Sequence, residues 1–70
     1  MRLVEILVEA AQRVFAEGYS LTWTVGEEAI ELALWGPRGY TFSNASLREA
    51  EGLADRVARA VSEMKNRLEE

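Results

Sequence analysis

The chain has 70 residues and contains neither cysteine nor histidine, which argues against disulfides, thiolate catalysis and the usual zinc sites. Twelve acidic and eight basic residues give a net charge of −4, so the surface is expected to repel nucleic-acid phosphates. The first residues lack the pattern of a secretion signal, and no apolar run approaches the roughly 20 residues that span a bilayer. We therefore expect one cytoplasmic domain, residues 1–70, without membrane contact.

Residues 3–15 show the spacing of an amphipathic helix. Apolar side chains recur at intervals of three and four, at Leu3, Leu7, Ala10, Ala11 and Val14. Val4 and Val8 widen the apolar face beyond what one neighbouring element covers, so they are candidates for contact with a partner. Gly18 predicts the end of this helix, because glycine readily takes the left-handed conformation that terminates helices.

The middle of the chain predicts three strands. Residues 19–25 and 30–35 alternate apolar and polar side chains on either side of the turn Gly26–Glu28. Gly36, Pro37, Arg38 and Gly39 suit a tight turn that returns the chain as a third strand, residues 40–43. We expect an inward face made of Leu21, Trp23, Val25, Ile30, Leu32, Leu34, Tyr40 and Phe42. The outward face is then expected to carry Thr22, Thr24, Glu31, Ala33, Trp35, Thr41 and Ser43.

A second helix is predicted from Leu47 onward. Ser46 and Glu49 have the serine-x-x-glutamate spacing of a capping box, and Gly52 interrupts the helix at a cost of about 1 kcal/mol relative to alanine. Its apolar stripe comprises Leu47, Ala50, Ala54, Val57, Val61, Met64 and Leu68. Since short connections make adjacent strands pair, the predicted fold is α+β with the order α-β-β-β-α. It is a three-stranded antiparallel meander with two helices packed on one face.

No group of side chains predicts catalysis, a metal site or a cofactor. Glu27 and Glu28 fall in a turn where solvent keeps both ionised, and none of the serines has a histidine to activate it. The loop around Arg38 lacks the spacing and the following helix of a phosphate-binding loop. We therefore predict that the protein is not an enzyme.

Trp35 is the strongest candidate for a binding residue. It alternates with Leu34, which places it on the face that the two helices leave open, and an exposed tryptophan is typical of a contact surface. The candidate contact residues are Trp35, Thr22, Thr24, Ala33, Thr41, Val4 and Val8. We predict an interaction module that binds another protein or itself, with a homodimer as the simplest case and no direct binding of nucleic acid.

Two resemblances concern the order of elements. The order resembles the double-stranded-RNA-binding domain, but residues 47–51 lack that family's lysine cluster, so RNA binding is not implied. The short first helix, the strand at residues 19–22, the loop 36–39 and the strand 40–43 resemble small acidic phage inhibitors, including anti-CRISPR proteins. This resemblance implies an alternative function, inhibition of a nucleic-acid enzyme. A further alternative is an orphan or designed stable domain without a partner.

Overall fold

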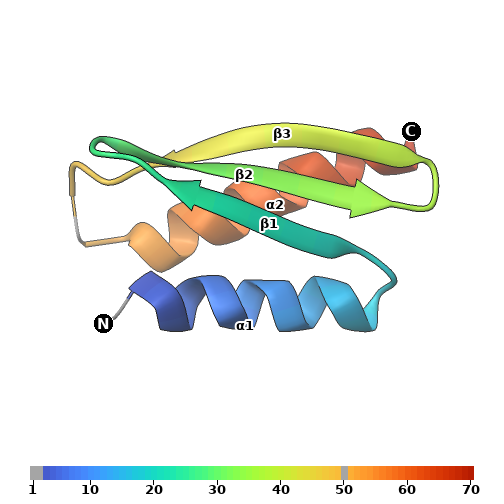
Figure 1. Ribbon diagram of the computed structural model, residues 1–70, viewed down its shortest axis with the longest axis horizontal. Helices are drawn as coiled ribbons and strands as arrows, with labels where there is room; N and C mark the ends of the chain where they lie inside the picture. Colours follow the sequence, from blue (N-terminus) through green and yellow to red (C-terminus); the bar gives the residue numbers. More distant parts are fainter. Residues whose placement is uncertain (1–2, 50) are drawn as a thin grey trace.

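The computed structural model describes residues 3–49 and 51–70 and contains one sheet and two helices (Figure 1). The elements are α1 (Leu3–Ala16), β1 (Ser20–Val25), β2 (Ala29–Gly36), β3 (Gly39–Ser46) and α2 (Leu53–Glu69). The sheet is antiparallel with strand order β1-β2-β3. The predicted α-β-β-β-α meander of the α+β class is therefore confirmed.

Both helices cover the same face of the sheet. In Figure 1, α2 crosses behind the strands, and α1 runs along β1 on the side away from β2. One continuous core joins the two helices to this inner face, and its fully buried side chains include Leu7, Ile30, Leu32, Leu34, Val57 and Met64. Trp23 also points to the inner face, but it lies on an edge strand and is only partly buried.

The first helix agrees with the sequence prediction. Its buried side chains, Ile6, Leu7 and Val14, repeat at the expected spacing. It ends before Gly18, which has a φ of 94° and so takes the left-handed conformation that glycine adopts without a steric penalty. Val4 and Val8 remain exposed.

The orientation of β3 differs from the prediction. The two-residue turn Pro37–Arg38 pairs Gly36 with Gly39, so that Tyr40 lies opposite Trp35 and Phe42 lies opposite Ala33. Residues directly opposite each other in a ladder share a face, so Tyr40 and Phe42 point outward with Trp35.

The remaining β3 positions therefore lie on the inner face. The predicted outward positions of Thr41 and Ser43 are wrong, because these residues pair with Leu34 and Leu32, whose side chains are buried in the core. Placing Tyr40 and Phe42 on the inner face would require a shift of one residue in the pairing of β2 with β3, which would reverse the face of every β3 side chain. The short turn fixes the register and prevents this shift, so the hydrophobicity of the β3 side chains does not decide which way they point.

The start of α2 also differs from the prediction. The helix begins at Leu53 rather than Leu47, because β3 extends to Ser46 and a loop follows it. Gly52 does not interrupt the helix. It precedes the first turn with a φ of 80°, a left-handed conformation that stops the helix from continuing toward its N-terminus.

The predicted capping box does not form at the start of α2. The Ser46 hydroxyl instead accepts a hydrogen bond from the backbone N–H of Arg48, at 3.2 Å, within the loop. Leu47, expected on the helix, packs against the core from this loop. Ala50, also expected on the helix, lies outside the described residues.

Arg56 holds this loop against the first turns of α2. Its Nε donates to the Ser46 carbonyl at 3.2 Å, its Nη1 donates to the Glu51 carbonyl at 3.0 Å, and its Nη2 donates to the Glu49 carbonyl. These charge-assisted hydrogen bonds satisfy carbonyls that a helix beginning at Leu47 would have paired internally. The three hydrogen bonds of Arg56 therefore close the core at the end where Leu47 packs into it.

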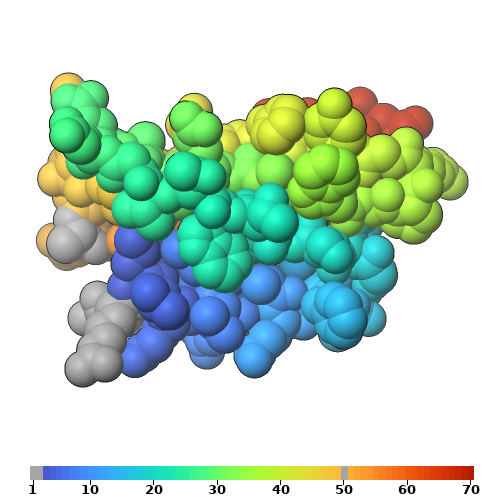
Figure 2. Space-filling model, in the orientation of Figure 1, coloured from blue at the N-terminus to red at the C-terminus, as the bar shows by residue number. Residues whose placement is uncertain are grey.

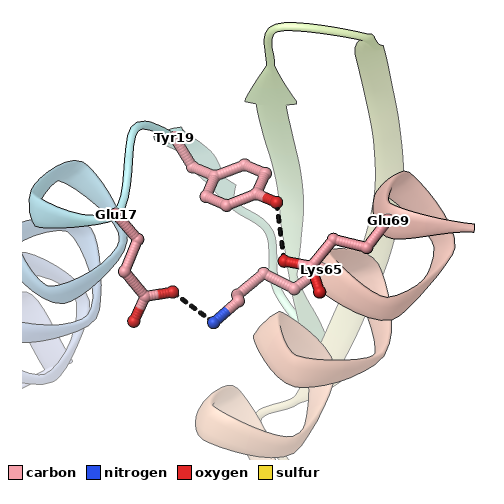
Figure 3. Close-up of polar contacts among 4 residues, drawn as sticks. All are labelled: Glu17, Tyr19, Lys65 and Glu69. Carbon is pink, nitrogen blue, oxygen red and sulfur yellow. Dashed lines mark hydrogen bonds and ion pairs between the residues drawn. The ribbon is translucent and has the colours of Figure 1, made fainter.

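Polar contacts close the opposite end of the core (Figure 3). The Tyr19 hydroxyl donates to Glu69 Oε2 at 2.8 Å, and Lys65 forms an ion pair with Glu17. The hydrogen bond to Glu69 raises the pKa of Tyr19, and the hydrogen bond to Glu17 raises the pKa of Lys65. Both contacts join the segment after α1 to the last turns of α2.

Candidate functional site

Three aromatic rings form a cluster on the outer face of the sheet. Trp35 and Tyr40 lie opposite each other on β2 and β3, with ring centroids 4.6 Å apart. Tyr40 and Phe42 alternate along β3 and meet edge to face, with centroids 5.3 Å apart. Such pairs contribute more than the burial of their area alone, so the rings support one another in a fixed arrangement.

The residues beneath the rings complete this surface. The Trp35 Nε1–H donates to Thr22 Oγ1 across the sheet at 3.4 Å, a long hydrogen bond that turns the indole toward β1. Ala33 is buried although it points outward, because it lies between Thr22 and Phe42 in the ladder. We call these five residues, Thr22, Ala33, Trp35, Tyr40 and Phe42, the aromatic face.

The aromatic face is open and almost free of charge. Trp35 is 44% exposed, Tyr40 55% and Phe42 62%, and no described element packs over them. Of the outward positions of the three strands, one carries an acidic or basic side chain, Glu31. Since charged residues make up 29% of the chain, their depletion here is typical of the centre of a protein–protein interface.

The predicted contact residues occupy three different places. Trp35, Thr22, Thr24 and Ala33 share the outer face, and the first two are joined by a hydrogen bond. Thr41 does not belong with them, because it points to the inner face, where its hydroxyl accepts a hydrogen bond from Arg67 Nη1 at 3.3 Å. Val4 and Val8 are exposed on α1, on a separate surface beside β1.

Two of the three rings, Tyr40 and Phe42, point outward, although their hydrophobicity predicts that they face the core. The signal that could have found them was the length of the Gly36–Gly39 turn. A two-residue hairpin loop places the residues flanking it in register, so an outward Trp35 requires an outward Tyr40.

Other kinds of site find little support in the described part of the chain. No three histidine, cysteine, aspartate or glutamate side chains gather there in a way that could hold a metal ion. Neither helix, over its described residues, has the length and apolar character needed to cross a bilayer. Glu27 and Glu28 are solvent-exposed in the β1–β2 turn, and Glu31 is exposed on the outer face. The aromatic face is therefore the best-defined candidate site.

Comparison of the chain with protein-family models, curated proteins and solved structures gives no match.

Proposed function

We propose that this protein is a non-enzymatic interaction module that associates with a second copy of itself through the aromatic face. The supporting observation is the cluster of Trp35, Tyr40 and Phe42, a preformed set of rings on an uncovered and almost uncharged sheet face. Aromatic side chains dominate binding energy at interfaces because they bury a large apolar area with few rotatable bonds.

A two-fold dimer is the simplest assembly for this surface. The same patch serves both partners in an isologous contact, so one aromatic face can cover another. Three strands about 4.8 Å apart and roughly 20 Å long offer on the order of 300 Å² per partner, which is below the standard interface size. We therefore expect a weak dimer, with a dissociation constant in the micromolar range.

Analytical ultracentrifugation across the micromolar range tests this proposal. We expect the average mass to rise toward that of a dimer with increasing concentration. Phe42→Ser and Trp35→Glu should keep the chain monomeric, whereas Phe15→Ser, an exposed position on α1, should dimerise like the unmodified protein. A mass that stays monomeric at hundreds of micromolar would refute self-association. Undiminished dimerisation of Phe42→Ser would refute the aromatic face as the contact.

The inhibitor function implied by the phage-protein resemblance requires a different surface. A protein that occupies a nucleic-acid site by charge mimicry needs acids gathered on one face, whereas Glu31 is the one acid among the outward positions of the three strands. Salt distinguishes the two functions. Charge-driven binding weakens steeply as ionic strength rises, and contact through the aromatic rings changes little.

A further inference from the structure

A second apolar surface lies beside β1, away from the aromatic face. Seven large apolar side chains are exposed in the described part of the chain, and four of them, Val4, Val8, Phe15 and Val25, belong to α1 and β1. Figure 2 shows the surfaces of β1 and α1 meeting along one side of the molecule. Between them lies a groove lined by Val8, Ala11, Gln12, Phe15, Ser20, Leu21 and Trp23, which we call the edge groove.

The backbone of β1 presents free hydrogen-bonding groups to this groove. The Gly26 N–H donates to the Ala29 carbonyl at 2.9 Å, which sets the alternation of the β1–β2 ladder. In an antiparallel ladder every second residue forms backbone hydrogen bonds with the neighbouring strand. Because Gly26 forms one, Thr24 and Thr22 also hydrogen-bond to β2. The N–H and C=O groups of Leu21, Trp23 and Val25 therefore point away from β2, and the described residues provide them with no backbone partner.

The other edge of the sheet is different. At β3, Arg67 from α2 donates through Nη1 to the Phe42 carbonyl at 2.9 Å and to Thr41 Oγ1 at 3.3 Å. A charged side chain across an edge strand hinders the addition of another strand. Of the two edges, β1 is therefore the one that combines free backbone groups with an apolar floor.

The charges around the edge groove favour a basic ligand. The face of α1 that lines it carries Val8, Gln12 and Phe15 and no charge. At the Val25 end, the chain turns through Glu27 and Glu28, and Glu5 borders the adjoining hollow on α1. Arg13, the one cation of the described part of α1, lines the separate groove between the two helices.

We propose that the edge groove binds an extended segment of another protein as a fourth strand. Alternate side chains of the segment enter the groove as apolar anchors, its backbone bonds to Leu21, Trp23 and Val25, and a basic residue lies near Glu27 and Glu28. A second copy of β1 fits less well, because α1 lies along this edge and a second α1 would need the same space (Figure 1). This site is independent of the aromatic face.

The probe is a synthetic peptide of alternating valine and threonine with two lysines at one end. Because a strand can add in either direction, the lysines are placed at the N-terminus in one version and at the C-terminus in another. Titration into the labelled protein should shift the amide resonances of Leu21, Trp23 and Val25 and slow their hydrogen exchange. Replacing the lysines with glutamates should weaken binding.

Phe15→Ser and Phe42→Ser form a matched pair of variants. Both phenylalanines are exposed, by 74% and 62%, so neither change should unfold the chain. Phe15→Ser should weaken peptide binding about tenfold, whereas Phe42→Ser should leave it unchanged. Equal effects of the two variants, no shifts with millimolar peptide, or equal binding of the glutamate peptide would overturn the proposal. Protection of the same amides by concentrating the protein alone would identify a second copy as the occupant and would also overturn it.

Discussion

Both faces of the sheet carry large apolar side chains, but the two faces have opposite environments. Leu34 and Trp35 are consecutive residues of β2, yet Leu34 is fully buried beneath the helices and Trp35 lies open on the other side. The inner face is covered by two helices and closed at both ends by polar contacts. The outer face has an organised aromatic cluster and no cover. Burial here depends on which face the helices reach, and the hydrophobicity of a strand residue does not predict it alone.

The difference between the covered and the open face is tested most strongly by comparing the stabilities of Leu34→Ala and Phe42→Ala. We expect Leu34→Ala to lower the free energy of unfolding by about 2–5 kcal/mol, because it leaves a cavity in the covered core. Phe42→Ala should cost less than about 1 kcal/mol, since its ring is already mostly exposed. Urea denaturation at a low protein concentration, where the monomer dominates, measures both values. Equal losses would mean that the outer face is also covered.

Trp23→Ala should fall between these two values. Its ring points to the inner face from the edge strand and is partly buried, so we expect a loss of about 1–2 kcal/mol from the same urea experiment. Val25→Ala, on the same strand but more exposed, is the control and should cost less. A loss at Trp23 as large as that at Leu34 would show that the β1 edge is covered rather than open.

Arg56→Gln tests the closure of the core at the Leu47 end. The change removes hydrogen bonds to the carbonyls of Ser46, Glu49 and Glu51, and we expect it to lower the free energy of unfolding by about 1–2 kcal/mol. Arg59→Gln, an exposed position on the same helix, is the control and should have little effect. Equal stabilities of the two variants in thermal melts would show that the hydrogen bonds of Arg56 do not stabilise the folded protein.

Tyr19→Phe tests the opposite end and should have the smallest effect at neutral pH. The pKa of Tyr19 is raised by its hydrogen bond to Glu69, so this contact contributes stability below the ordinary tyrosine pKa of about 10. That contribution is lost as the pH rises through the higher pKa of the folded state. Melting temperatures measured from pH 8 to above pH 10 should therefore fall more for the unmodified protein than for Tyr19→Phe. An equal fall in melting temperature for the two proteins would show that ionisation of the Tyr19 hydroxyl does not affect the stability of the fold.

Local periodicity and turn residues were enough to predict the element order and the positions of α1, β1 and β2. The spacing of Leu3, Leu7 and Val14 identifies one helical face without reference to the rest of the chain. The alternation of Leu34 and Trp35 likewise placed Trp35 on the open face, where the structure has it. These properties depend on neighbours within a few residues, and such neighbours are visible in sequence.

The orientation of β3 and the start of α2 were decided by contacts between distant segments. Tyr40 and Phe42 look like core residues by hydrophobicity, but pairing with Trp35 and Ala33 turns them outward and so creates the aromatic face. Ser46 and Glu49 match a helix cap, yet Arg56 binds the loop carbonyls and Leu47 packs into the core, which favours a helix that begins at Leu53. Strand register and loop anchoring depend on which segments meet in space, and the periodicity of a single segment does not contain that information.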